Sequence, residues 1–419
     1  MTEGVDQDDV LWARNVLLGT ERPSPRRAVD ACRVLARVSP ATYLPRLSKA
    51  LYELAFVAEL REKPEIRLTL FEEAVEAAYA MDETDPQRAD VLLSSLDWQQ
   101  RELFGLGRRP EGLAVCEEMA RVSRRAVDAG APEAGGLYAW ARALAEEGRH
   151  GEAAALYEEF ARRSRPRGPQ GGGTAWVFIE WGAEAEAAGL GAAAVEAARE
   201  LVALQREDLA GRNASLALLL FALVRLAEVL DGQGESEEAS AALAEAGELY
   251  AELASHGDPH SAGSYRYTFW AVLFGLTGRA EEPAAPGRPA PPFGSEALHW
   301  ARDVRERYFA GLPALETALT EPACDDDLAE RIRRHRRLTV RATLHAQHRH
   351  GYRFLESVRP HFEEGVALAR RLHALDPAAG AAPLARALFD RAGALTTDHH
   401  FAAAQSDFEE ARALRAALR

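Results

Sequence analysis

The chain is poor in cysteine and has no long hydrophobic run. Its three cysteines, Cys32, Cys116 and Cys324, are far apart and share no CxxC or Cys/His spacing, which argues against a zinc site or a disulfide framework. The longest apolar stretch, 214–224, is interrupted at Arg225 and is shorter than the roughly 20 residues of a membrane span. We therefore expect no membrane segment, no metal and no cofactor.

Lysine and aromatic residues are also scarce. Lys49 and Lys63 are the only lysines among 50 basic residues, and aromatic residues make up 8% of the chain. With abundant Ala, Gly and Pro, this usage is typical of GC-rich bacterial coding, so we expect a bacterial source. The formal net charge of −15 argues against general nucleic-acid binding, because phosphate binding needs a concentrated basic surface. Residues 1–9 are acidic and unlike a signal peptide, which predicts a cytoplasmic protein.

The sequence is rich in helix-forming residues and in a repeated turn. Ala, Leu, Glu and Arg fill most positions, and no alternating pattern indicates a sheet. The turn has the form Gly-Arg-x-x-Glu-Ala, with its best copy at 148–153, and it joins two amphipathic segments. Its glycines are spaced by 41, 41, 45 and 44 residues, at Gly107, Gly148, Gly189, Gly234 and Gly278. This spacing predicts an all-α superhelix, a solenoid of antiparallel helix pairs.

One segment interrupts the repeat. Residues 281–293 contain five prolines in thirteen residues, which excludes helix and favours an extended, semi-rigid connector. We therefore predict a helical-repeat array over 1–280, a Pro-rich linker over 281–294 and a C-terminal helical segment over 295–419. Beyond the linker, the acidic residues 325–327 are expected to cap a helix that reaches about His350.

The helix pairs resemble the tetratricopeptide repeat family over 41–280, in about five units, and more weakly after residue 325. The small and aromatic positions of that family correspond here to Gly182, Gly189 and Ala194, to Ala141, Gly148, Ala153 and Tyr157, and to Ala55, Phe71 and Ala74. The period here is longer than the about 34 residues of that family. The resemblance implies that the first helix of each pair lines a concave groove, and that this groove binds a peptide or a partner protein.

The resemblance also implies which side chains face the groove. They are Lys49, Tyr52, Asp97, Arg101, Tyr138, Arg142, Trp176, Glu228, Tyr265, Arg341 and His345. Tyr, Trp and Arg carry much of the binding energy when a partner desolvates them. The alternative for each residue is packing between helices. Because acidic and basic residues alternate in this set, it favours an extended partner of mixed charge.

Histidine is the only catalytic residue type that clusters. His345 and His348 are spaced i, i+3 and could ligate a metal, but no third ligand and no HExxH pattern accompany them. The neighbouring run 331–337 holds five arginines and would repel a cation. We expect these arginines to pair with residues 325–327 and Glu330. The stretch 171–174 lacks the lysine of a phosphate-binding loop.

These patterns favour a non-enzymatic interaction scaffold or ligand-sensing adaptor, of the kind that accompanies bacterial signalling proteins. Two other function classes stay open. The first is an enzyme on a solenoid scaffold, with a pocket near the linker, and the second is a homo-oligomeric structural protein, such as a homodimer. The enzyme hypothesis would place its chemistry on Trp300, Arg302, Tyr308, Arg341, His345 and His348.

Overall fold

The computed structural model describes residues 6–19, 21–130, 135–164, 173–211, 215–258, 264–284, 287–320 and 327–418. Cys324 and the acidic residues 325–326 lie outside these ranges, as do residues 171–172 of the stretch that lacks the lysine of a phosphate-binding loop. In the described part of the chain almost every element is a helix, and the β structure found there is one isolated bridge between Phe293 and Ser295. The all-α prediction is confirmed.

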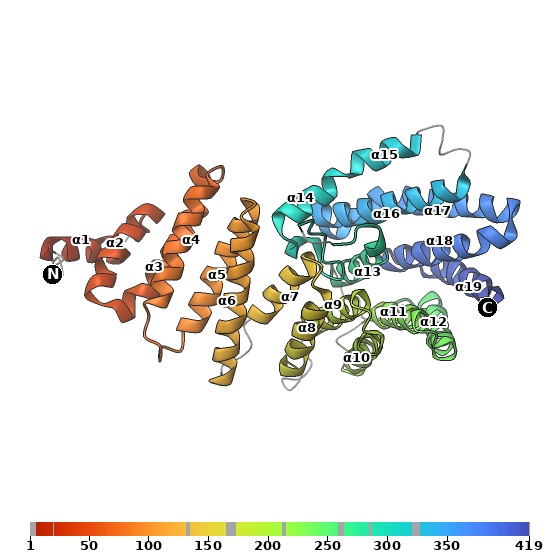
Figure 1. Ribbon diagram of the computed structural model, residues 1–419, viewed down its shortest axis with the longest axis horizontal. Helices are drawn as coiled ribbons and strands as arrows, with labels where there is room; N and C mark the ends of the chain where they lie inside the picture. Colours follow the sequence, from red (N-terminus) through yellow and green to blue (C-terminus); the bar gives the residue numbers. More distant parts are fainter. Residues whose placement is uncertain are drawn as a thin grey trace. The chain divides into compact units, whose positions relative to one another are not determined.

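The helices follow one another along the chain, mostly with short connections, and the Pro-rich segment lies in the long one between α13 and α14 (Figure 1). The α-helices are α1 (Gln7–Leu18), α2 (Pro25–Val38), α3 (Pro40–Ala55), α4 (Pro64–Tyr79), α5 (Arg88–Gly105), α6 (Arg109–Asp128), α7 (Gly136–Glu146), α8 (His150–Ser164), α9 (Gly173–Ala187), α10 (Gly191–Ala210), α11 (Leu216–Gly232), α12 (Ser236–His256), α13 (Ser264–Leu276), α14 (Arg302–Ala310), α15 (Leu312–Thr320), α16 (Leu328–His350), α17 (Phe354–Leu375), α18 (Pro377–Thr397) and α19 (Phe401–Ala417). Four short 3₁₀ helices are η1 (Ala58–Leu60), η3 (Arg279–Glu281), η4 (Ala297–His299) and η6 (Gly351–Arg353).

By its internal contacts the chain divides into two compact units. Unit 1 comprises residues 1–143 and 301–303, and unit 2 comprises 144–300 and 304–419. The residues of α7 are shared between the two. Each unit is described by itself below.

Unit 1 is a stack of consecutive helices. Each helix from α1 to α6 packs against the next one, and the short turns make neighbours antiparallel. Leu51 of α3 and Phe71 of α4 are buried in one apolar cluster, while Leu92 of α5 and Met119 of α6 belong to the next. The first cluster draws on α2, α3 and α4 and the second on α4 to α7, so each spans a run of consecutive helices, as expected of a repeat array.

Unit 2 starts in the same way and then closes on itself. The helices α8 to α12 pack in sequence, and so do α15 to α19. In addition, α19 packs against α12, and α13 packs against α11, α16 and α18. The helices on either side of the Pro-rich segment therefore form one compact unit.

The Pro-rich segment is packed into unit 2. The backbone N–H of Ala290 donates to the carbonyl of Glu146 at 2.9 Å, and the Phe293 ring lies 5.6 Å from that of Tyr308. Gly294 has φ +113° and lies so close to α9 that an added Cβ would be 2.9 Å from the Cβ of Ala183. The sequence predicted an extended, semi-rigid connector here, and it did not indicate these contacts with the helices. The division into 1–280, 281–294 and 295–419 remains a prediction.

The chain after this segment also differs in part from the expected helices. The sequence indicated a helix from about residue 295, whereas α14 begins at Arg302. The Trp300 indole donates to the carbonyl of Ser295 at 3.1 Å and spans the short 3₁₀ helix η4 that occupies this segment. As expected, Asp327 caps α16, because its carboxylate accepts from the backbone N–H of Glu330 at 3.0 Å.

The repeated turn has a physical explanation. Gly107, Gly148, Gly189 and Gly234 have φ between +72° and +79°, the left-handed region that glycine enters at little cost. Gly278 is the exception, with φ −94°, because a 3₁₀ helix follows it.

The Gly-Arg-x-x-Glu form of the turn also includes an ion pair. The guanidinium of Arg149 donates to Glu152 at 2.7 and 2.6 Å, and Arg108 contacts Glu111 in the same way. Hydrogen bonding to Arg149 lowers the pKa of Glu152. The Gly-Arg-x-x-Glu motif therefore combines a left-handed turn with an ion pair across the first turn of the next helix.

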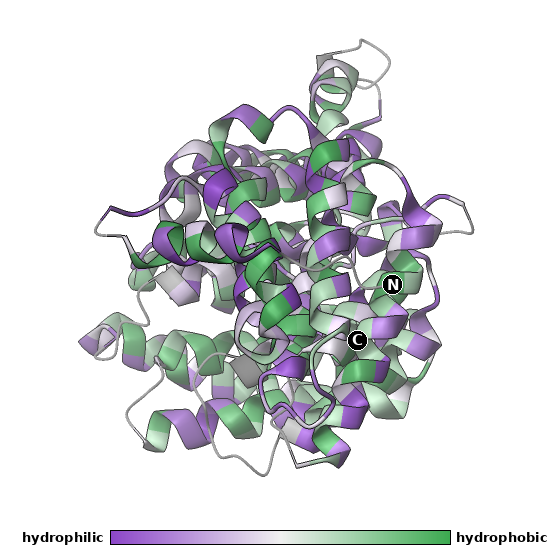
Figure 2. Cartoon of the chain, turned by 90° about the vertical axis from the view of Figure 1, so that its left-hand side faces the viewer, coloured by the Kyte–Doolittle hydropathy of each residue, from purple (hydrophilic) through white to green (hydrophobic). Residues whose placement is uncertain are grey.

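Hydrophobic and hydrophilic residues lie side by side on the same helices, as Figure 2 shows. This distribution is typical of helices that bury one face and expose the other. In the described ranges, we find no helix that is both long enough and apolar enough to cross a membrane.

A pair of matched substitutions tests the turn geometry. Gly189→Ala should lower the free energy of unfolding by about 1 kcal/mol, because a side chain is disfavoured at φ +72° and nothing else lies within 4 Å. Gly148→Ala should cost more, because its Cβ would also meet the Cβ and the carbonyl oxygen of Ala284 at 3.2 Å. Urea unfolding of both variants measures the difference. Equal losses would contradict this account of Gly148.

Candidate functional site

A groove in unit 1 is the best candidate for a binding site. It lies between α3, α4 and α5 and has a volume of about 590 Å³. Its walls are formed by Pro45, Arg46, Ser48, Lys49 and Tyr52 of α3, by Phe71 and Ala74 of α4, and by Gln87, Asp90, Val91, Ser94, Ser95 and Trp98 in and next to α5.

Buried hydrogen bonds hold the two sides of the groove together. The hydroxyls of Ser48 on α3 and Ser95 on α5 are 2.9 Å apart, and the Ser95 hydroxyl also donates to the carbonyl of Val91. Both serines are buried. Small side chains at these positions let α3 and α5 approach each other, so the groove exists before any partner binds.

Aromatic rings form part of the groove wall, and Phe56 packs on them from outside the lining. Tyr52 lies 4.9 Å from Phe56 and 5.3 Å from Trp98, and Phe56 lies 4.8 Å from Trp98. Phe71 supports this cluster from below at 6.2 Å. Tyr52 is 37% exposed and Phe56 is 50% exposed. These two large rings are therefore exposed to water at one place. Covering them with a partner would lower the free energy, because it removes apolar surface from water.

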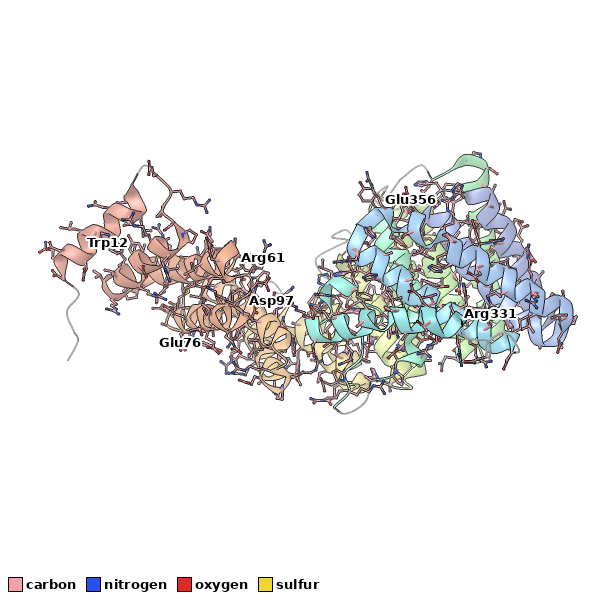
Figure 3. The ribbon with its side chains drawn as sticks, turned by 90° about the horizontal axis from the view of Figure 1, so that it is seen from above. Trp12, Arg61, Glu76, Asp97, Arg331 and Glu356 are labelled. Atoms are coloured by element: carbon pink, nitrogen blue, oxygen red, sulfur yellow. The ribbon has the colours of Figure 1, made fainter. Side chains whose placement is uncertain are left out.

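Charged side chains surround these rings. Arg46 and Lys49 are exposed on α3, Asp90 is exposed on α5, and within the described ranges none of the three has an ion-pair partner. Arg101 pairs with Asp97 at 2.9 Å, and its guanidinium lies 5.3 Å from the Trp98 ring. Figure 3 labels Asp97. The groove therefore offers both signs of charge next to an aromatic surface.

The structure brings four of the predicted groove residues together. Lys49 and Tyr52 line the groove, while Asp97 and Arg101 flank Trp98 on α5. Arg46, Phe56 and Trp98 were missed. The position of Trp98 directly after the predicted groove residue Asp97 could have suggested it as a groove residue. Its contact with Tyr52 could not be predicted, because it depends on the packing of α3 against α5.

Tyr138 and Arg142 also belong to unit 1, on α7. The guanidinium of Arg142 lies 4.9 Å from the Tyr138 ring, and both side chains are half-buried. They do not line the groove described above.

In unit 2 the predicted residues pack between helices. Trp176 and Tyr265 are in edge contact at 5.3 Å, and burial raises the pKa of Tyr265. Glu228 pairs with Arg386 at 3.0 Å. Arg341 is buried, pairs with Glu282 and lies 4.3 Å from the Tyr308 ring. These contacts correspond to the packing alternative that the sequence left open.

The histidines of α16 pack against an aromatic ring. His345 and His348 lie 4.9 and 5.8 Å from Phe309 of α14. Burial is the main cause that lowers the pKa of both, and nearby Arg349 and Arg305 add to it. Over the part of the chain that the structure describes, no three His, Cys, Asp or Glu side chains are arranged to hold a metal ion.

The arginine run 331–337 is engaged in ion pairs. Arg333 and Arg334 pair with Glu330, as the sequence indicated. Arg336 pairs with Asp390 at 2.7 Å and Arg337 with Glu281 at 2.8 Å. The last two partners are remote in sequence and could not be predicted.

His335 of α16 generates a prediction about pH. It is 3% exposed, and its Nε2 lies 3.4 Å from Glu364. Burial lowers its pKa, with the Glu364 carboxylate opposing that effect. As the pH falls below about 6.5, the unfolded chain binds a proton that the folded chain does not, so the free energy of unfolding should fall by up to about 1.4 kcal/mol per pH unit. The stabilisation by neutral, buried His335 is fully present above the pKa of the unfolded chain. It is lost as the pH falls from there toward the lower pKa of His335 in the folded protein.

The matched variants are His335→Gln and, at an exposed histidine of the same helix, His350→Gln. Urea unfolding between pH 7.5 and 5, in about half-unit steps, should show a flatter pH dependence for His335→Gln than for His350→Gln. Parallel curves for the two variants would refute the role of His335.

Comparisons with known proteins add little to this site. No protein-family model and no curated protein matches the chain. A solved structure with a similar arrangement is the crystal structure of BtubC (BKLC) from P. vanneervenii, at 19% sequence identity and a TM-score of 0.40. The match covers 58% of this chain and 93% of that one. At this score the likeness carries no argument about function.

Proposed function

We propose that this protein is a non-enzymatic interaction scaffold that binds an extended segment of a protein partner in the groove of unit 1. The observation that carries the proposal is the half-exposed aromatic cluster of Tyr52, Phe56 and Trp98 beside the unpaired cations Arg46 and Lys49. Tyr, Trp and Arg are the residue types that most often dominate binding at interfaces.

The chemistry of the groove defines the partner. An apolar or aromatic side chain of the partner covers the rings of Tyr52 and Phe56, and a neighbouring carboxylate pairs with Lys49 or Arg46. A basic residue of the partner faces Asp90 on the opposite wall. The partner segment is therefore extended, amphipathic and of mixed charge.

The groove is suited to binding because it is already formed. The hydrogen bond between Ser48 and Ser95 and the aromatic contacts fix α3 against α5. A site that does not reorganise loses less entropy when it binds.

We further infer that the helix pairs are of the tetratricopeptide type, and that the protein works as an adaptor of a bacterial signalling process in the cytoplasm. The left-handed glycine turns and the small residues between helices support this assignment.

No observation favours the enzyme hypothesis over the scaffold. In unit 2, the Trp300 ring packs 5.6 Å from Tyr308, and Arg341 is held by Glu282 and by the Tyr308 ring. His345 and His348 pack on Phe309. These side chains are engaged in packing and ion pairs, while Tyr52, Phe56 and Lys49 of unit 1 are exposed to a partner. The homodimer remains a prediction.

Two substitutions in the groove test the proposal. Tyr52→Ala removes an aromatic anchor, and Lys49→Glu reverses a charge that pairs with no residue of the described chain. The intact protein captures its partner from a lysate, mass spectrometry identifies it, and affinity is then measured with the purified partner. Each variant should weaken binding at least about tenfold, or about 1.4 kcal/mol.

Matched controls separate binding from folding. Tyr352→Ala removes an exposed tyrosine of unit 2, and Lys63→Glu reverses the only other lysine at an exposed position. Both controls should bind like the wild type, and Lys49→Glu should leave the melting temperature unchanged. A partner that binds Tyr52→Ala and Lys49→Glu as tightly as the wild type would overturn the proposal.

A further inference from the structure

Unit 2 contains a second cavity that the scaffold function does not use. It lies between α17, α18 and α19 and has a volume of about 250 Å³. A cavity of about 150 Å³ holds a benzene molecule, so this one has room for a six-membered ring with a short chain. It is too small for a folded partner or for an extended peptide segment.

The floor of the cavity is apolar. Leu355 and Phe362 of α17 and Ala394 of α18 line it and are buried. The Phe362 ring is fixed from behind, because Phe274 and Trp270 of α13 lie 5.3 and 5.7 Å from it. The floor is therefore rigid and offers its apolar surface to a hydrocarbon group.

The rim of the cavity is charged, and its two arginines are already paired. Arg391 donates to both carboxylate oxygens of Asp407 at 2.6 and 2.7 Å. Arg359 donates to Asp398, which also lies 3.4 Å from Nε2 of His400.

The third carboxylate of the rim, Glu363, is exposed. Across the described ranges, no ion pair or hydrogen bond engages it. Three carboxylates against two guanidiniums leave the rim with an excess of one negative charge, at Glu363. A carboxylate or phosphate ligand would meet arginines that are already paired, whereas a cation would meet the Glu363 carboxylate, which interacts with Arg391 without a direct ion pair.

We propose that this cavity binds a small organic amine, with its ammonium group at Glu363 and its apolar body on the floor formed by Leu355, Phe362 and Ala394. An alkylammonium group is protonated at neutral pH and makes a charge-assisted hydrogen bond to a carboxylate. The size of the cavity and the apolar floor define the body as a single ring or a branched aliphatic chain. This site lies in unit 2 and does not depend on the groove of unit 1.

The test uses three probes of similar shape and different charge. They are 2-phenylethylamine, 2-phenylethanol and 3-phenylpropanoate, titrated into the full-length protein by isothermal titration calorimetry at low ionic strength. The amine should bind saturably with a Kd below about 1 mM, and the alcohol and the carboxylate should bind at least about tenfold more weakly.

Two substitutions assign the binding to this cavity. Glu363→Gln should weaken amine binding about tenfold and leave alcohol binding unchanged. Glu356→Gln is the matched control, because Glu356 is an exposed acid of the same helix outside the cavity (labelled in Figure 3). Ala394→Leu fills the floor and should abolish binding of the amine, with the melting temperature recorded to show that the variant is folded.

Three outcomes would overturn the proposal. The first is the absence of amine binding at amine concentrations up to about 10 mM, which is about tenfold above the expected upper limit of the Kd. The second is equal binding of the carboxylate probe. The third is unchanged amine binding by Glu363→Gln, which would place any amine site elsewhere even if Ala394→Leu did not fold.

Discussion

The burial of one apolar stripe per helix against its neighbours is the constraint on which the rest of the structure depends. In unit 1 each helix satisfies it with the helices before and after it, so Leu51 and Phe71 share one cluster and Leu92 and Met119 the next. In unit 2 the same constraint closes the array, because Phe408 of α19 packs 4.6 Å from Tyr250 of α12. Stacking and closure thus follow from one hydrophobic requirement.

The candidate binding site is a consequence of how closely two helices pack. The small side chains of Ser48 and Ser95 allow α3 to pack closely against α5. In this arrangement the Tyr52 ring lies 5.3 Å from the Trp98 ring. The rings contact one another, and those of Tyr52 and Phe56 still face water. A stack of helix pairs can therefore bury its core and expose aromatic surface at the same time.

Arginine is the basic partner in most ion pairs of the described residues. Its planar guanidinium can bind a carboxylate with two hydrogen bonds, and it does so within turns at Arg149 and between helices at Arg336 and Arg391. Lys49 and Glu363 are exposed charges that have no ion-pair partner within the described ranges, and each lies beside an apolar surface that a ligand can cover.

The sequence by itself determined the helical class, the recurrence of the glycine turns and the capping of α16 by Asp327, because these depend on residues close together in the chain. The resemblance to a repeat family also placed Lys49 and Tyr52 in a groove, and both line the groove of unit 1; that they bind a partner remains a prediction. Only the tertiary structure decided that the Pro-rich segment is packed, that α19 contacts α12, and that Trp98 joins Tyr52. Local periodicity specifies which face of a helix is apolar, but the helix that covers it is chosen by long-range packing, which no short-range pattern records.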